Sequence, residues 1–200
     1  MPLQKIIISS FSRLYLWKIT ETIPQLINLL DAEVSPEYLR YKTAVHQKQN
    51  LAKQLLFQYM RINDQIHYLQ SGKPVLSGGR HISVSHSKDW VGVVLSNEPV
   101  GLDMEFARLQ LIRTASKYIH PDEMQLFDNP SVESFQYAWT AKESIYKLAG
   151  QPALFFKRDI RLLHLETGNG TACLQQKRKI SLFFNKIAPD LLICQAVFQQ

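Results

Sequence analysis

The sequence predicts an α+β fold made of two similar halves, residues 1–98 and 99–200. Its length of 200 residues fits one compact domain or two small subdomains that share an interface. Hydrophobic residues make up 46% of the chain, which is enough for a core and argues against disorder. Predicted strands, a helix and strands are followed, after residues 97–99, by a strand, helices and strands. No internal sequence repeat relates the two halves.

The first half is expected to begin with a strand pair, residues 6–9 and 13–20, that buries Leu14, Leu16 and Trp17. A short helix over residues 24–30 follows. Ser35 and Pro36 predict the start of a longer helix that ends at Tyr59. Its expected apolar stripe consists of Tyr38, Leu39, Val45, Leu51, Leu55, Leu56 and Tyr59, opposite Lys42, Lys48 and Lys53.

Turns are expected at residues 72–74 and 78–79, and they precede strands over residues 81–85, 90–96 and 100–106. Residues 109–118, 121–127 and 131–149 are predicted helices, the last one capped by Gly150. Residues 158–165 and 171–176 are expected to form strands on either side of the turn at residues 168–170. Residues 180–184 and 191–198 are a further candidate strand pair.

Composition limits the classes of protein that fit. Cys173 and Cys194 have no paired spacing, which indicates a reduced, cytoplasmic compartment and neither a zinc site nor disulfides. No apolar run approaches the roughly 20 residues of a membrane span, and the N-terminal segment lacks the pattern of a signal peptide. The formal net charge of +6 favours an anionic partner. Nucleic acid, an acidic protein and a polyphosphate ligand all satisfy that condition.

Two carboxylates stand out on the strand over residues 100–106. Because strand side chains alternate, Asp103 and Glu105 point to one face while Leu102 and Met104 point to the other. Two like charges on one face repel, and a hard divalent cation would relieve that repulsion. The pattern therefore indicates a metal site, with an edge strand carrying two solvated acids as the alternative.

Trp139, Glu143 and Lys147 are spaced by four residues and share one face of the predicted helix over residues 131–149. Trp139 argues against full exposure, so the stripe is expected at the boundary between core and cleft. Glu143 would then supply a third oxygen to a cation or act as a base, and Lys147 would meet a phosphate. An exposed ion pair worth roughly 0.3–0.5 kcal/mol is the alternative.

Ser85, His86 and Ser87 end a predicted strand, where hydroxyl and imidazole groups can bind phosphate oxygens. A histidine bonded to the backbone is the alternative. Neighbouring strand residues point apart and no G-x-S-x-G elbow is present, so a hydrolase triad is discounted.

In order and spacing these motifs resemble those of the 4'-phosphopantetheinyl transferases, specifically the double-length surfactin-synthetase branch. The motifs are Gly72-Lys73-Pro74, Ser85-His86-Ser87, Gly101-Leu102-Asp103-Met104-Glu105 and the helix motif from Trp139 to Lys147. They cover about half of the chain, and the last two together are fairly specific. The resemblance implies two α/β subdomains with antiparallel sheets, related by a pseudo-two-fold axis.

The resemblance also implies roles for individual residues. Asp103, Glu105 and Glu143 would hold Mg²⁺ against the pyrophosphate of coenzyme A, whose charge Lys147 would neutralise. His86 would contact phosphate beside Ser85, Lys73 would reach the adenosine end with its 3'-phosphate, and Lys48 is a weaker phosphate candidate. The chain departs from the family at three places: Ile82-Ser83-Val84 replaces a Phe-Asn pair, Ala52 replaces a glycine, and no acid stands near Val45.

The implied reaction is attack of a carrier-protein serine on the β-phosphorus of coenzyme A, with 3',5'-adenosine bisphosphate as the leaving group. Glu143, directly or through a metal-bound water, would take the serine proton. Lys117, Arg108 and Arg113 are candidates for docking an acidic carrier onto a monomeric enzyme. The alternatives are a degenerate relative that binds without turnover and a basic metal-dependent nucleic-acid-binding protein. No nucleic-acid-binding motif is recognisable.

Overall fold

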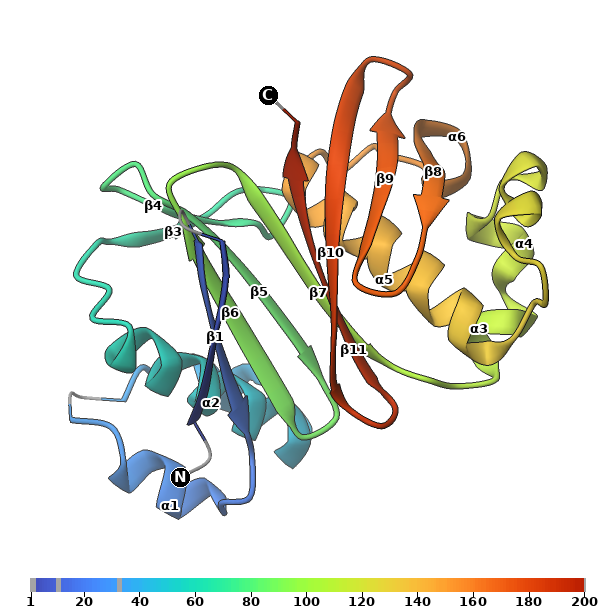
Figure 1. Cartoon of the computed structure of the whole chain (residues 1–200). Helices are drawn as coiled ribbons and strands as arrows, with labels where there is room; N and C mark the ends of the chain where they lie inside the picture. The colour runs from blue at the N-terminus through green and yellow to red at the C-terminus, as the bar shows by residue number, and fades with distance from the viewer. Residues whose placement is uncertain (1–2, 10–11, 32–33, 200) are drawn as a thin grey trace.

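The computed structural model describes residues 3–9, 12–31 and 34–199, and in residues 3–9 it describes the backbone alone. A four-stranded antiparallel sheet comes from the first half of the chain and has the order β1-β2-β6-β5 (Figure 1). Its strands are β1 (Leu3–Ser9), β2 (Ser12–Lys18), β5 (His81–Ser87) and β6 (Trp90–Ser96). The predicted N-terminal strand pair is confirmed as β1 and β2.

A five-stranded antiparallel sheet comes from the second half and has the order β7-β11-β10-β9-β8. Its strands are β7 (Val100–Phe106), β8 (Ile160–Leu165), β9 (Asn169–Leu174), β10 (Arg178–Ala188) and β11 (Leu191–Phe198). A small hairpin of β3 (Ile66–Tyr68) and β4 (Pro74–Leu76), which the sequence did not predict, carries the Gly72 turn. Mixed α/β content with antiparallel sheets is confirmed, whereas the pseudo-two-fold axis and the division at residues 98 and 99 stay predictions.

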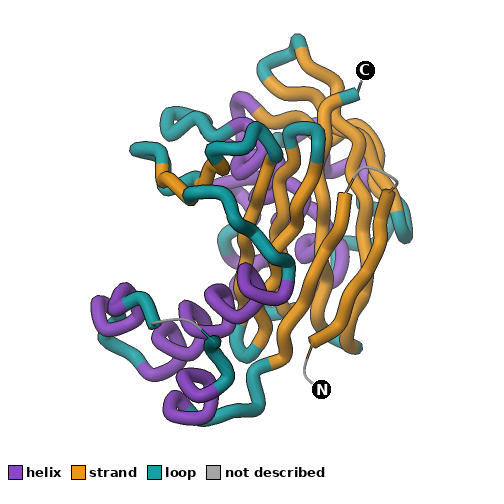
Figure 2. The backbone as a smooth tube through the Cα atoms, turned by 90° about the vertical axis from the view of Figure 1, so that its left-hand side faces the viewer, coloured by secondary structure: helices purple, strands orange, loops and turns teal. Residues whose placement is uncertain are grey.

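Strand β2 has buried side chains on both faces: Leu14 and Leu16 are buried on one and Trp17 on the other, as expected. Leu14 and Leu16 belong to a cluster that includes Leu102 of β7 and Ile193 of β11, so it joins the two sheets. Trp17 points the other way, into a cluster with the N-terminal helices. In Figure 2 the strands of both sheets lie together, and helices of the N-terminal half gather at the lower left.

The predicted long helix of the first half is two separate elements, so that prediction was wrong. Ser35 caps a 3₁₀ helix, η1 (Pro36–Arg40), and Thr43 caps a new helix, α2 (Ala44–Tyr59), because its hydroxyl accepts from the N–H of His46. Leu51, Leu55 and Leu56 are buried as expected. Four residues of the predicted apolar stripe are not buried: Tyr38 is half-buried, and Leu39, Val45 and Tyr59 are exposed. Helix α1 (Ile23–Asn28) packs on α2.

The helices of the second half are also shorter than predicted, with one exception. The expected helix over residues 109–118 is broken at Thr114 into α3 (Gln110–Arg113) and α4 (Ala115–Tyr118). The next element is a 3₁₀ helix, η2 (Pro121–Leu126), and a short helix that the sequence did not predict, α6 (Phe156–Asp159), precedes β8. Within the described residues, no helix is both long and apolar enough to cross a membrane.

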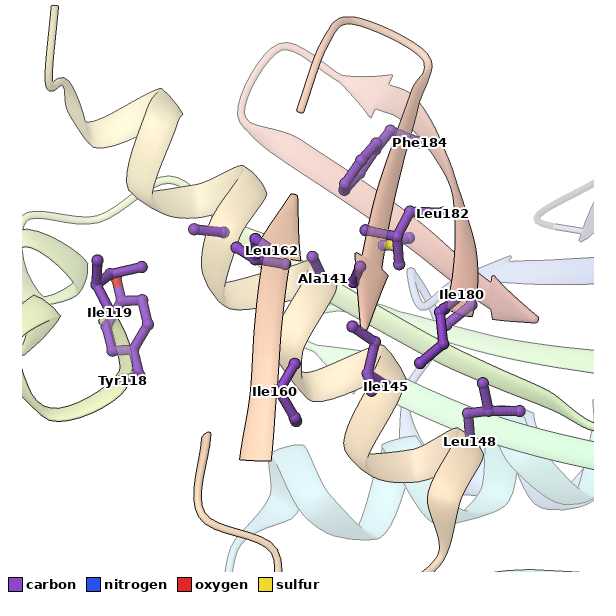
Figure 3. Packing of buried hydrophobic residues seen from close by; sticks show 14 of the residues in the cluster. Tyr118, Ile119, Ala141, Ile145, Leu148, Ile160, Leu162, Ile180, Leu182 and Phe184 are labelled. Carbon is purple, nitrogen blue, oxygen red and sulfur yellow. The ribbon is translucent and has the colours of Figure 1, made fainter. Parts of the chain in front are cut away.

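Helix α5 (Val132–Ala149) confirms the strongest helix prediction, and Gly150 ends it in the left-handed conformation at φ 63°. Ala141, Ile145 and Leu148 of α5 share a buried cluster with Ile180 and Leu182 of β10 (Figure 3). The opposite, partly exposed side of the same helix is therefore held in a fixed position, and it carries Glu143 and Lys147.

A fully buried lysine ties α5 to its surroundings. The Nζ of Lys142 lies 2.8 Å from Glu123 in η2 and also donates to the carbonyl oxygens of Phe156 and Ile160, at 3.1 and 2.8 Å. Both carboxylate oxygens of Glu123 are used as well, because the backbone N–H groups of His120 and Leu162 donate to them. The network joins α5, η2, α6 and β8.

Two serines of β5 join the sheets along a seam with β7. The N–H of Leu102 donates to the hydroxyl of Ser83 at 3.0 Å, and the N–H of Met104 donates to that of Ser85 at 3.1 Å. The two serine hydroxyls therefore accept the hydrogen bonds that backbone carbonyl oxygens of a neighbouring strand would accept in a continuous sheet. The Ile82-Ser83-Val84 stretch is thus a strand segment at the junction of the two sheets.

Candidate active site

Strand β7 presents two carboxylates beside α5. Leu102 and Met104 are buried between the sheets, whereas Asp103 and Glu105 point to the other face, as predicted from strand alternation. Asp103 is buried with a relative exposure of 6%, and Glu105 is half-buried. A buried carboxylate needs a charged or hydrogen-bonding partner, so the surroundings of Asp103 determine what this face can do.

A glycine brings this strand against the helix. A Cβ atom on Gly101 would lie 1.9 Å from the carbonyl oxygen of Ser144 and 2.5 Å from the nitrogen of Leu148. Only a residue without a side chain allows this approach of β7 to α5. The first position of the Gly101–Glu105 motif therefore sets the separation between the acids of β7 and those of α5.

Lys147 of α5 makes the closest contact to Asp103. Its Nζ lies 2.7 Å from Asp103 Oδ1 and donates to the hydroxyl of Ser85 at 3.0 Å. The same Ser85 hydroxyl donates to Asp103 Oδ1 at 2.9 Å. Ser85 is buried, and its hydroxyl contacts Asp103 and Lys147. This serine therefore orients both side chains.

Glu105 is held from several sides. Arg108 donates to its carboxylate at 2.9 Å, and Gln136 of α5 donates to the backbone carbonyl oxygen of Glu105 at 2.6 Å. Burial raises the pKa of Glu105; the Arg108 charge opposes that effect and the Asp103 charge adds to it. Arg108, which the sequence suggested for partner docking, is therefore engaged at this site.

Glu143 faces the same region from α5. Burial raises its pKa to about 7, and the negative charges of Asp103 and Glu105 contribute to that rise, so these carboxylates share one electrostatic field. Within the described chain, no hydrogen bond or ion pair to its carboxylate is found. A half-buried acid with a pKa near neutrality is suited to take up or release a proton.

Asp103, Glu105 and Glu143 have the ligand chemistry of a magnesium site, but their carboxylates do not converge on one point. Within residues 3–9, 12–31 and 34–199, no group of three or more His, Cys, Asp or Glu side chains is arranged to hold a metal ion. The Lys147 ammonium sits on Asp103 and the Arg108 guanidinium on Glu105, where they balance charge that a divalent cation would otherwise balance. The oxygen donors of Asp103, Glu105 and Glu143 nonetheless fit the preference of Mg²⁺ for carboxylates.

A pocket of about 200 Å³ opens beside Lys147 and Glu143. Lys73 lines it, but its Nζ donates to the carbonyl oxygen of Leu148 at 2.6 Å, near the C-terminal end of α5. Burial lowers the pKa of Lys73. This lysine therefore has a structural partner already, next to the place where a ligand would lie.

A second pocket, of about 300 Å³, shares Gly72, Pro74 and Val84 with the first. His86 lines it, with its ring centroid 6.4 Å from that of His46. Loss of hydration and the positive charge of Lys147 lower the pKa of His86. A neutral imidazole on the lining of this second pocket can donate or accept a hydrogen bond.

Sequence reasoning missed the residues of α2 that line this second pocket. His46, Gln49, Asn50 and Lys53 line it, whereas Lys48 does not. Gln49 Oε1 and Asn50 Nδ2 are buried and have no hydrogen-bond partner among the described residues. The i, i+3, i+4, i+7 spacing of these four residues marks one helix face, but that this face lines a pocket depends on Tyr68, Val84 and His86, which come from other elements.

Comparison with known proteins supports the family suggested by the motifs. Residues 99–195 match the family model described as the 4'-phosphopantetheinyl transferase superfamily. The 4'-phosphopantetheinyl transferase gsp of Aneurinibacillus migulanus is 31% identical over 142 residues, 63% of this chain and 60% of that protein. The 4'-phosphopantetheinyl transferase psf-1 of Bacillus pumilus is 33% identical over 87 residues, 40% of this chain and 37% of that protein.

A Bacillus subtilis protein named 4'-phosphopantetheinyl transferase is 28% identical over 86 residues, 40% of this chain and 38% of that protein. Even the alignment with the Aneurinibacillus migulanus protein spans only 60% of the relative's length. The matched family segment contains Asp103, Glu105, Glu143 and Lys147, and excludes Lys73 and His86.

Proposed function

We propose that this chain is a magnesium-dependent 4'-phosphopantetheinyl transferase that moves the phosphopantetheinyl group of coenzyme A onto a serine of a carrier protein. The observation that carries the proposal is the set of Asp103, Glu105, Glu143 and Lys147, which face one another from β7 and α5 within the segment that matches the transferase superfamily. Acids and a lysine beside a pocket suit binding of a charged polyphosphate better than they suit a core.

Asp103, Glu105 and Glu143 would hold Mg²⁺ through carboxylate oxygens. When bound, the ion would neutralise the charge of the pyrophosphate and of the departing phosphate. Lys147 would then leave Asp103 and turn its ammonium to the pyrophosphate, where His86 adds a hydrogen bond. The Ser85 hydroxyl would keep Asp103 oriented during this exchange, a role supported by its 2.9 Å contact with that carboxylate.

The chain's own residues would position the reaction and move one proton. The carrier serine oxygen attacks the β-phosphorus of coenzyme A, its proton passes to Glu143 directly or through a water, and 3',5'-adenosine bisphosphate departs. The position of Glu143 on the lining of the 200 Å³ pocket, with no hydrogen-bond partner for its carboxylate among the described residues, supports this role. The two connected pockets would bind the rest of coenzyme A, with Lys73 close to the nucleotide and Lys48 outside the lining.

The proposal extends to the branch of the family, the carrier and the oligomeric state. We place the chain in the surfactin-synthetase branch, acting as a monomer on an acidic carrier, because residues of the first half and residues of α5 in the second half line the same 200 Å³ pocket within one chain. A relationship of the two halves by a pseudo-two-fold axis is part of the same proposal.

Transfer to a panel of apo-carriers tests the function. The chain is incubated with coenzyme A, Mg²⁺ and each carrier, and the carrier mass is followed by mass spectrometry. We expect one carrier to gain a phosphopantetheinyl group, with loss of that gain in EDTA and in Asp103→Ala. Asp128→Ala, which removes an exposed acid with no partner among the described residues, serves as the control. Full transfer by Asp103→Ala would refute the assigned site, and binding of coenzyme A without transfer to any carrier would indicate a degenerate relative.

A further inference from the structure

A basic pocket is lined by residues of the second half of the chain, none of which lines the two pockets of the candidate active site. It has a volume of about 580 Å³ and is enclosed by α4, α6, β8 and the turn after β9. Four cationic side chains line it: Lys117, Lys157, Arg158 and Arg161. We call this surface, together with Lys177 in the adjoining turn, the basic pocket.

The basic pocket concentrates positive charge. Its five Lys and Arg residues are accompanied by Asp122, paired with Arg161 at 3.0 Å, and Asp159, paired with Arg158 at 2.7 Å. Five cations and two carboxylates leave a charge of +3, which is half of the formal net charge of +6 of the whole chain. A local excess of this size attracts an anionic partner and directs its approach.

Several of these groups are available to a partner. Lys117 and Lys177 are exposed, and within the described residues no hydrogen bond or ion pair to their ammonium groups is found. Phe155 is 61% exposed, and the Arg158 guanidinium lies 4.5 Å from its ring centroid. An exposed aromatic ring stacked with an arginine is a common anchor in protein–protein interfaces.

Two packed aromatic side chains connect the basic pocket with the candidate active site. Phe156, which lines it, packs on Tyr146 of α5 with ring centroids 5.6 Å apart. Tyr146 in turn lines the pocket that contains Glu143 and Lys147. A protein bound at the basic pocket would therefore lie beside the opening where its serine must arrive.

From these observations we propose that the basic pocket is the docking surface for the acidic carrier protein, with Phe155 as its apolar anchor. This inference rests on the proposed function. It keeps Lys117 from the docking residues suggested by the sequence, and it assigns docking to Lys157, Arg158 and Arg161 in place of Arg108 and Arg113. A protein partner is favoured over nucleic acid because the proposed function requires a protein whose serine reaches Glu143 and Lys147, and the exposed Phe155 offers that protein an apolar contact beside the cations.

Charge reversal tests the docking surface in the full-length chain. The double variant Lys117→Glu/Lys157→Glu is compared with Arg13→Glu/Lys18→Glu, which makes the same charge change at exposed positions of β2. We expect the KM for the apo-carrier to rise about 10-fold or more only in the first variant, because opposed charges become like charges. The KM for coenzyme A and kcat at saturating carrier should not change, and 0.5 M salt should reduce the difference, since exposed charges are then screened. Phe155→Ala should raise the same KM without this salt dependence.

Direct binding of labelled apo-carrier, measured by fluorescence anisotropy without coenzyme A, separates failure of this inference from failure of the proposed function. Carrier binding that Lys117→Glu/Lys157→Glu abolishes supports docking even if no transfer occurs. An unchanged carrier affinity in that variant, or equal weakening in the β2 control, would overturn it. Salt-sensitive binding of a single-stranded oligonucleotide at this pocket, with no carrier binding, would overturn it in favour of a nucleic-acid partner.

Discussion

Replacing Lys142 by methionine should be among the most destabilising single substitutions in the chain. Lys142 and Glu123 both have fully buried side chains, and the lysine donates three hydrogen bonds, to Glu123 Oε2 and to two backbone carbonyl oxygens. Methionine fills a similar volume but satisfies none of these acceptors. It leaves the Glu123 carboxylate buried beside apolar atoms, without its cation.

The expected loss follows from that geometry. Removing one partner of a buried ion pair costs about 3–5 kcal/mol, a large share of the roughly 5–15 kcal/mol that stabilises a typical domain. The double variant Lys142→Met/Glu123→Leu removes both charges, although it leaves the N–H groups of His120 and Leu162 without acceptors. Because no charge is left buried without a partner, the double variant should be more stable than Lys142→Met alone.

Urea unfolding followed by circular dichroism measures these free energies, and the double-mutant cycle gives the coupling between the two residues. The reasoning would be refuted if Lys142→Met lost less than about 1 kcal/mol, since a buried unpaired carboxylate cannot be that inexpensive. It would also be refuted if the double variant were less stable than the single one.

Three further substitutions test other parts of the structure. The pKa of Glu143 is raised from 4.5 to about 7, so the folded state binds a proton more tightly than the unfolded state and its stability falls as pH rises through this window. In EDTA, the free energy of unfolding of Glu143→Gln should therefore exceed that of wild type by up to about 3 kcal/mol at pH 8 and equal it at pH 4, as judged by thermal unfolding. An equal difference at both pH values would contradict this assignment. Ser83→Ala leaves the buried N–H of Leu102 without its acceptor and should cost about 1–3 kcal/mol in urea unfolding, whereas Ser87→Ala, whose 3.4 Å contact is only partly buried, should cost much less. Gly101→Ala should lower both the thermal midpoint and the transfer rate, because its Cβ would overlap the Ser144 carbonyl; wild-type values for both would show that β7 and α5 can separate freely.

Local patterns were sufficient where one signal dominated. Ser131 and Gly150 mark the two ends of α5, and alternation alone placed Asp103 and Glu105 on the face opposite Leu102 and Met104. The N-terminal strand pair followed from β-branched and aromatic residues, and its expected burial of Leu14 and Leu16 agrees with the structure.

Prediction failed where two helix starts competed or where a partner came from far along the chain. Ser35 and Thr43 are both good caps, and the sequence does not say that the chain leaves the helical conformation at Tyr41 between them. The roles of Lys142 and Lys73 depend on Glu123 and on the Leu148 carbonyl, 19 and 75 residues away. Likewise, Ser83 was noted only as a departure from the family motif, although its hydroxyl accepts a hydrogen bond from the backbone of β7 across the junction of the two sheets.

The most direct test of the account is a crystal structure of the chain with Mn²⁺, in place of Mg²⁺, and coenzyme A, in which anomalous scattering locates the metal. We predict one peak coordinated by Asp103, Glu105 and Glu143, with the Lys147 ammonium moved from Asp103 to the pyrophosphate. Bound coenzyme A with no peak there, and with Lys147 still 2.7 Å from Asp103, would contradict the proposed metal site.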